Sequence, residues 1–75
     1  MDKAVALNPR LAAAYFARGL TRQSDIDAKG AIADYSKAIE LKPNYFQAYD
    51  SRGISEAALG DFDSAIADFS KAIEF

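Results

Sequence analysis

Apolar side chains recur along this chain at steps of three and four residues, a spacing that places them on one face of an α-helix. The pattern predicts four helices, over residues 11–24, 28–41, 46–58 and 62–75. A shorter apolar segment over residues 1–8 ends at a proline, which disfavours helical geometry in the residue before it. We therefore expect an all-α chain in which residues 1–8 form part of one further helix.

The second half of the chain repeats the first at an offset of 34 residues. Residues 31–41 (AIADYSKAIEL) return as residues 65–75 (AIADFSKAIEF). At the same offset, Lys3, Ala4, Leu7 and Pro9 match Lys37, Ala38, Leu41 and Pro43, and Ala14, Tyr15, Arg18 and Gly19 match Ala48, Tyr49, Arg52 and Gly53. A period of roughly 20 to 50 residues is typical of a repeat architecture. The pattern predicts stacked helical hairpins, preceded by the tail of a helix from an earlier unit.

The turn inside the first unit is atypical. Gly60 follows the helix over 46–58 as the expected left-handed stop, but Ile26 occupies the same place in the first unit, and Gly30 comes later. One fused helix from about residue 11 to residue 41 is therefore an alternative, at little cost in helix propensity. We expect a closed hairpin instead, because Asp27 can cap the second helix and Gly30 weakens continuity.

These residues resemble the tetratricopeptide repeat, whose pattern is Trp-x2-Leu-Gly-x2-Tyr, then Ala-x3-Phe, then Pro, over about 34 residues. The matching positions are Tyr15-x2-Arg18-Gly19 and Tyr49-x2-Arg52-Gly53, Ala31-x3-Tyr35 and Ala65-x3-Phe69, and Pro9 and Pro43. The chain departs from the pattern at Arg18 and Arg52, which replace leucine, and at Arg22 and Glu56, which replace the second aromatic residue. The resemblance implies an α-solenoid of helix-turn-helix units in a single domain over 1–75, with repeats over 10–43 and 44–75.

Most of the repeated residues have a structural explanation. Gly19 and Gly53 would let the first helix of each unit approach Ala31 and Ala65 of the second closely. The aromatic residues Tyr15, Tyr35, Tyr49 and Phe69 would fill the space between helices. Two charged pairs recur sixteen residues apart, Arg18 with Asp34 and Arg52 with Asp68. We expect a contact between adjacent helices, within a unit or across the boundary from Arg52 to Asp34, in preference to a ligand site.

Composition limits the chemistry that the chain can perform. With 51% hydrophobic residues the chain is too apolar to be disordered. It has no cysteine and no histidine, which removes disulfides, thiolate nucleophiles, imidazole bases and the usual ligands of zinc, copper and haem. Asp61 and Asp63 lie close together, but helix capping explains them. We expect no enzyme activity, no catalytic residue, no metal and no cofactor.

Charge and hydropathy limit the partners in the same way. A net charge of −2 argues against broad binding of nucleic acid or of an anionic membrane. No apolar run approaches the roughly 18 residues of a membrane span, and the N-terminus lacks the core of a signal peptide. We expect a cytoplasmic protein whose partners are proteins or peptides.

In the family that the sequence resembles, the first helix of each repeat lines a concave groove that binds a peptide. By position, the groove residues would be Ala13, Phe16, Leu20, Gln23, Gln47, Asp50, Ile54 and Ala57. Some members of the family hold a C-terminal carboxylate with lysine, arginine and asparagine at these places, and none of those residue types is present among the eight. We expect a scaffold that binds an apolar or amphipathic segment, anchored on Phe16, Leu20 and Ile54, without a carboxylate clamp.

The alternative is a structural module that stacks end to end on copies of itself as a homo-oligomer. Its terminal helices would expose Ala4, Val5 and Leu7 at one end and Ile66, Phe69, Ile73 and Phe75 at the other. Up to Lys42 there are seven basic and five acidic residues, and from Pro43 onward two basic and six acidic. Unlike charges would favour a head-to-tail approach over a swapped or face-to-face dimer. Equally, the chain can be a fragment of a longer array in which neighbouring repeats cover both ends.

Overall fold

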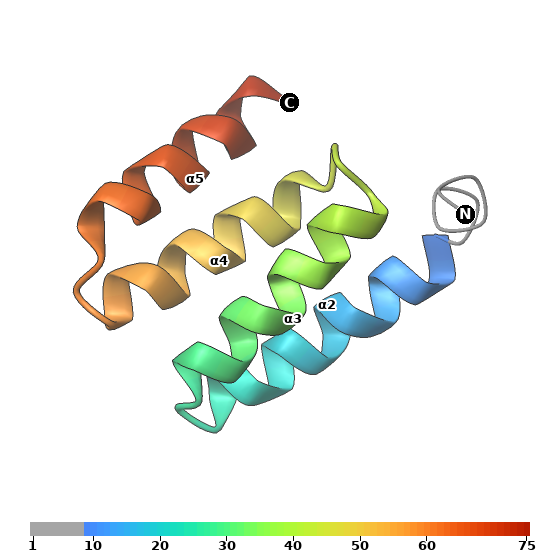
Figure 1. Ribbon diagram of the computed structural model, residues 1–75, viewed down its shortest axis with the longest axis horizontal. Helices are drawn as coiled ribbons and strands as arrows, with labels where there is room; N and C mark the ends of the chain where they lie inside the picture. Colours follow the sequence, from blue (N-terminus) through green and yellow to red (C-terminus); the bar gives the residue numbers. More distant parts are fainter. Residues whose placement is uncertain (1–8) are drawn as a thin grey trace.

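Residues 9–75 are described by a computed structural model, and this part of the chain consists of α-helices joined by short turns (Figure 1). The helices are α2 (Pro9–Ser24), α3 (Ala28–Leu41), α4 (Phe46–Ala58) and α5 (Phe62–Glu74). The prediction of an all-α chain is confirmed for these residues. The boundaries of α3 and α4 are those predicted, whereas α2 begins two residues early and α5 ends one residue early. The predicted helix over 1–8, which carries Ala4, Val5 and Leu7, lies outside the described residues.

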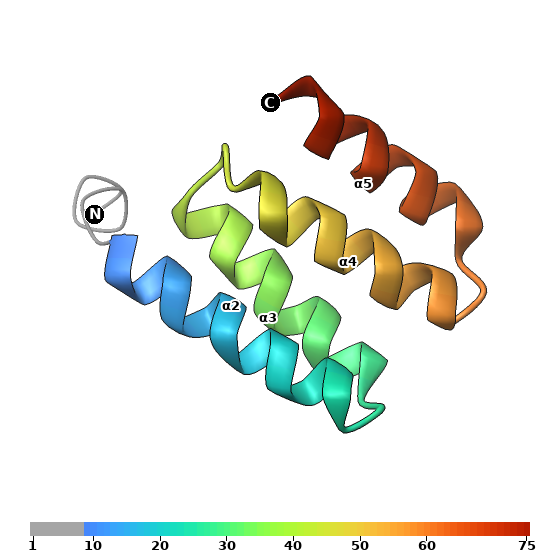
Figure 2. The same cartoon turned by 180° about the vertical axis from the view of Figure 1, so that it is seen from behind.

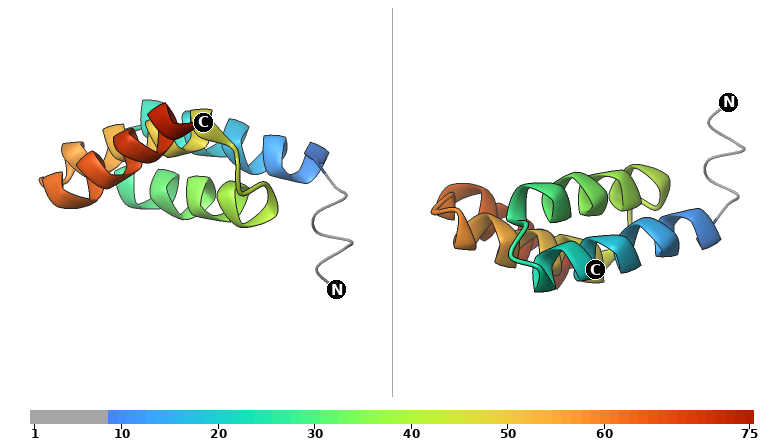
Figure 3. Two further views of the ribbon diagram at one scale, coloured as in Figure 1. Left: turned by 90° about the horizontal axis from the view of Figure 1, so that it is seen from above. Right: turned by 90° about the horizontal axis from the view of Figure 1, so that it is seen from below.

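The helices lie side by side in chain order, as both faces of the molecule show (Figures 1 and 2). Each of the pairs α2 with α3 and α4 with α5 forms an antiparallel hairpin, and α4 packs between α3 and α5. Seen from above and below, α2 and α4 lie in one layer and α3 lies across them in another (Figure 3). This arrangement agrees with the predicted stacking of helix-turn-helix units.

The core of the described residues is small and consists mainly of alanine. The buried apolar residues are Ala12, Ala31, Tyr35, Ala38, Leu41, Ala48 and Ala65. Gly19 and Gly53 permit this close packing, and the atoms nearest to a Cβ built on each belong to an aromatic ring. A Cβ atom on Gly19 would lie 2.5 Å from the ring of Tyr35, and one on Gly53 would lie 2.7 Å from the ring of Phe69. Each glycine therefore makes room for an aromatic ring of the facing helix.

Both hairpins close through a left-handed residue, although only one of them uses glycine. Gly60 ends the turn after α4 with φ 85°, and Ile26 adopts φ 59° at the same place after α2. Asp27 then caps α3 by accepting a hydrogen bond of 3.0 Å from the Gly30 amide, and Asp61 caps α5 in the same way. The predicted closed hairpin is confirmed, and the fused-helix alternative is wrong.

Candidate functional site

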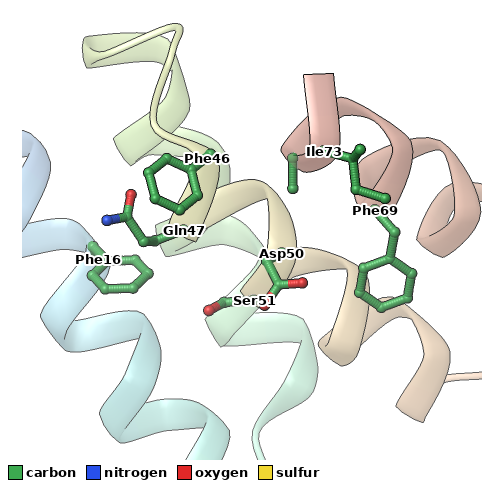
Figure 4. Close-up of a pocket in the computed structure, with 8 residues that line it drawn as sticks. Phe16, Phe46, Gln47, Asp50, Ser51, Phe69 and Ile73 are labelled. Carbon is green, nitrogen blue, oxygen red and sulfur yellow. The ribbon is translucent and has the colours of Figure 1, made fainter. Parts of the chain in front are cut away.

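A cavity of about 600 Å³ opens between α2, α4 and α5 (Figure 4). Its lining consists of Phe16 from α2, of Phe46, Gln47, Asp50 and Ser51 from α4, and of Phe69, Ala72 and Ile73 from α5. In Figure 4, Phe16 and Phe46 lie on one side of the cavity, Phe69 and Ile73 on the other, and Asp50 with Ser51 between them. The cavity is therefore walled by three helices and both repeats.

The lining is apolar except for three polar residues of α4. Among the described residues that line the cavity, Asp50 is the only charged one, and Gln47 and Ser51 supply neutral polar groups. The ring of Phe16 packs against the rings of Tyr35, at 5.7 Å between ring centroids, and Tyr45, at 5.1 Å. An apolar wall with one carboxylate suits an apolar surface that carries a cation. A carboxylate ligand would meet no cationic donor in this lining.

The cavity and the predicted groove overlap only in part. Phe16, Gln47 and Asp50 line the cavity, and the other five predicted positions, Ala13, Leu20, Gln23, Ile54 and Ala57, lie outside it. Leu20 and Ile54 are partly exposed beside it, as an accessible groove requires. Gln23 instead has a structural contact, since its side-chain oxygen accepts hydrogen bonds from the Tyr35 hydroxyl at 2.6 Å and the Ser55 hydroxyl at 3.5 Å.

The contribution of α5 is what the groove prediction missed. Phe69 and Ile73 were assigned to an apolar end, and they form one wall of the cavity. Ile73 is 85% exposed, and Ile66 and Phe75, the other described members of that end, are also more than half exposed. The 34-residue offset could have indicated this role, because Phe69 and Ile73 correspond to Tyr35 and Ile39 in the first repeat.

The first repeated charge pair joins the two helices of the first hairpin, with Asp34 buried and Arg18 partly exposed. Two nitrogens of Arg18 donate to the two carboxylate oxygens of Asp34, at 3.0 and 2.8 Å, and Arg22 adds a contact of 3.1 Å to the same carboxylate. The hydrogen bond from Arg18 lowers the pKa of Asp34. The predicted contact within the unit is confirmed, and the alternative from Arg52 to Asp34 is wrong.

The second charge pair carries an extra acid. Arg52 donates to both oxygens of Asp68 at 2.8 Å, and Glu56 lies 3.7 Å from the same guanidinium with its side chain 12% exposed. Burial, followed by hydrogen bonding to Asp68, raises the pKa of Glu56 to about 7. Burial acts to raise the pKa of Asp68 too, but hydrogen bonds from Arg52 and Glu56 outweigh it and lower that pKa. This cluster between α4 and α5 therefore contains an acid, Glu56, whose pKa lies near neutral pH.

Comparisons with known proteins agree with this architecture. The family model of the tetratricopeptide repeat matches residues 12–45 and 46–75. A solved structure described as the crystal structure of MamA superposes with a TM-score of 0.83 at 39% identity, covering 95% of this chain and 42% of that one. A second, described as the crystal structure of MamA protein, gives a TM-score of 0.81 at 39% identity, covering 95% and 39%. No curated protein matches the chain.

The chain belongs to the tetratricopeptide repeat family, and its helical-repeat fold is that of an interaction scaffold. Repeats of this family generally mediate contacts between proteins, and such scaffolds are in general not enzymes. The chain spans about two fifths of the length of the MamA structures that it matches. No helix among the described residues is long and apolar enough to cross a membrane, and the same residues hold no cluster of three potential metal ligands.

Proposed function

We propose that this chain binds an apolar or amphipathic helical segment of another polypeptide in the cavity between α2, α4 and α5. The observation that carries the proposal is the lining itself: Phe16, Phe46, Phe69 and Ile73 face one hollow of about 600 Å³. A cavity of that size takes two or three large side chains, as the exposed face of a short helix would present. Leu20 and Ile54 extend the apolar surface beyond the cavity.

Electrostatics narrows the class of ligand. Asp50 contributes a carboxylate to the lining, and the hairpin over residues 46–74 carries six acidic residues against two basic ones. A ligand with a lysine or arginine beside its apolar residues would therefore be preferred over an acidic one. A free C-terminal carboxylate would be disfavoured, because the lining offers it no charged donor.

Peptide binding can be measured by fluorescence anisotropy, with a labelled amphipathic helical peptide of about four turns. We expect a Kd of roughly 10 to 100 µM for a version with leucines on one face and a lysine beside them. Replacing that lysine by glutamate should weaken binding about tenfold, and Asp50→Lys in the protein should reverse the preference. An acidic pentapeptide with a free carboxylate should bind more weakly than either.

Two exposed isoleucines give a matched pair of variants. Ile73→Glu places a charge in the wall of the cavity and should abolish binding of the amphipathic peptide. Ile26→Glu makes the same substitution at a residue that is 93% exposed in the turn between α2 and α3, and should leave binding unchanged. Equal effects of the two variants, or tight binding of the acidic pentapeptide, would contradict the proposed site.

A further inference from the structure

The cavity has a filled counterpart in the first repeat. At the 34-residue offset, its members Asp50, Phe69, Ala72 and Ile73 correspond to Phe16, Tyr35, Ala38 and Ile39. That surface is covered by the start of the second repeat. Tyr35 and Ala38 are fully buried, and the ring of Tyr45, just before α4, lies 5.1 Å from that of Phe16. The cavity on the second hairpin therefore corresponds to the surface of the first hairpin that α4 covers. None of the described residues covers it on the second hairpin.

A matching surface exists on α2, the counterpart of α4. A hollow of about 240 Å³ on α2 is lined by Leu11, Ala14, Tyr15 and Arg18, which correspond to Tyr45, Ala48, Tyr49 and Arg52. On α4 this face is buried against α3, since Ala48 is 0% exposed and Ser55 is 1% exposed. On α2 the counterparts of these two residues, Ala14 and Thr21, are exposed. The second surface of the internal interface is thus present on α2, where Ala14 and Thr21 are not covered by any other described helix.

The polar contact across the internal interface can also be repeated. Arg52 of α4 donates to the hydroxyl of Ser36 on α3 at 3.1 Å, in addition to its pairing with Asp68. The corresponding donor on α2 is Arg18, whose side chain is 57% exposed against 21% for Arg52. The corresponding acceptor on α5 is Ser70, which is exposed. Both groups are therefore available for the same hydrogen bond between two molecules.

The two surfaces carry opposite charge. With the internal ion pairs included, residues 9–41 of the first hairpin hold five basic and four acidic residues, whereas residues 46–74 of the second hold two basic and six acidic residues. The approach of α2 to α5 therefore brings unlike charges together, and the approach of α5 to α5 brings like charges together. Charge complementarity favours a head-to-tail contact over a symmetric one.

We infer that the cavity binds α2 of a second copy of this chain, in the register that continues the 34-residue repeat across the molecular boundary. Ala14 and Arg18 of the second copy then take the places that Ala48 and Arg52 take inside the molecule, with Arg18 donating to Ser70. This inference rests on the proposed function, because it names the helical segment that enters the cavity. Among the described residues each copy presents one surface of each kind, so the contact would add further copies in a row.

Sedimentation equilibrium of the full chain tests the inference. Over roughly 10 to 500 µM, the weight-average mass should rise above the 8.1 kDa of one chain as concentration increases. Ala14→Glu alters only the surface on α2, and Ile73→Glu only the cavity. Each variant alone should remain at 8.1 kDa, because each lacks one of the two surfaces. Ile26→Glu, outside both surfaces, should associate as the original chain does.

An equimolar mixture of the two variants gives the sharpest result. The intact cavity of the Ala14→Glu chain can receive the intact α2 of the Ile73→Glu chain, and neither product can add another copy. The mixture should therefore reach twice the mass of one chain and stop there. A symmetric contact through α5 would instead let Ala14→Glu pair with itself, and that outcome would overturn the inference. Circular dichroism with unchanged helix content shows that both variants are folded.

Peptide binding separates this inference from the proposed function. Ala14 lies outside the cavity, so Ala14→Glu should bind the lysine-bearing amphipathic peptide with the affinity of the original chain. A chain that binds the peptide but stays at 8.1 kDa throughout the concentration range would overturn self-association alone and leave the cavity to a different protein. A chain that neither binds the peptide nor associates would overturn both.

Discussion

The two hairpins share a glycine under an aromatic ring and a bidentate arginine–aspartate pair, but they differ at the charged position one helical turn later. Arg22 in the first hairpin adds a second cation to Asp34 at 3.1 Å. Glu56, at the same place in the second, adds a second acid beside Asp68. One oxygen of Glu56 is buried, with no hydrogen-bond partner among the described residues. Both hairpins therefore keep the glycine, the aromatic ring and the arginine–aspartate pair. The charge one turn later is positive in one hairpin and negative in the other, and the negative charge of Glu56 is energetically unfavourable.

The hairpins also differ in how firmly the shared ring is held. Tyr35 is fully buried, and its hydroxyl donates to Gln23 at 2.6 Å, so the ring has no room to move. Phe69 has no hydroxyl and lines the open cavity. The same packing contact is therefore rigid in the first hairpin and able to adjust in the second.

Substituting the two glycines should give the largest single loss of stability, and a larger loss in the first hairpin than in the second. A Cβ on Gly19 would lie 2.5 Å from the Tyr35 ring, and Gly19→Ala should lower the free energy of unfolding by about 2 to 3 kcal/mol. Gly53→Ala should cost only about 1 kcal/mol, because Phe69 can turn into the cavity and alanine favours the helix. Urea unfolding of the two variants measures both values. Equal losses would show that the cavity gives Phe69 no freedom.

The acid in the second hairpin should give the next largest effect, as a pH dependence. The folded state raises the pKa of Glu56 from its ordinary 4.5 to about 7, so folding favours the protonated form. The free energy of unfolding should therefore fall as pH rises from about 4.5 to about 7. Glu56→Gln keeps a neutral donor at this place, and should remove that slope and stabilise the chain by roughly 2 kcal/mol at pH 8.

The control for this prediction is Arg22→Gln at the same place in the first hairpin, which should leave the slope between pH 4.5 and 7 intact. Below about pH 4 all three chains should lose stability together, because the lowered pKa values of Asp34 and Asp68 mean that folding favours their ionised forms. Stability of the original chain should thus be highest near pH 4.5, between the loss at lower pH and the loss at higher pH. A flat profile from pH 4.5 to 7 would show that Glu56 is ionised in the folded state without penalty.

The turns should give the smallest change in stability for a single substitution, with opposite signs in the two hairpins. Ile26 has φ 59°, a left-handed conformation that disfavours β-branched side chains, and its side chain is 93% exposed and gains little from packing. Ile26→Gly should therefore raise the free energy of unfolding by about 0.5 to 1 kcal/mol, after allowing for the entropy of glycine in the unfolded chain. Gly60→Ala, at the left-handed place in the second turn, should lower it by about 1 kcal/mol. Thermal melts that shift in the same direction for both variants would contradict this explanation.

The repeat period made the fold predictable, because it fixed helix spacing, turn position and the capping residues Asp27 and Asp61 together. The contacts of the glycines were not predictable in detail. Sequence spacing shows that Gly19 faces the second helix of its unit, but only the rotamer of Tyr35 decides that the ring, and not Ala31, fills the space. The sequence predicted that each arginine pairs with an aspartate of a neighbouring helix. Only the packing geometry shows that both partners belong to the same hairpin.

The candidate site was less predictable than the fold. Assigning the groove by helix position found Phe16, Gln47 and Asp50, since these belong to the first helix of each unit. The same assignment missed Phe69 and Ile73, which lie on the second helix of their unit. Whether these side chains line a cavity depends on how the helices pack, which helix position alone does not give. Gln23 was placed in the groove by its position, yet its side-chain oxygen is occupied by the Tyr35 hydroxyl at 2.6 Å. The periodicity of the sequence cannot predict a hydrogen bond of this kind.

The alanine-rich core has a consequence for how this chain can vary over evolution. Five of the seven buried apolar residues among those described are alanines, so most buried positions have no side chain left to shorten. Shortening a buried side chain usually destabilises a core, but among the buried apolar residues described here only Tyr35 and Leu41 have a large side chain to shorten. Enlargement is the greater hazard, because each added methyl group must push two backbones apart. A saturation mutagenesis survey should therefore find that damage at buried sites tracks volume gained, and that serine is accepted where valine is not.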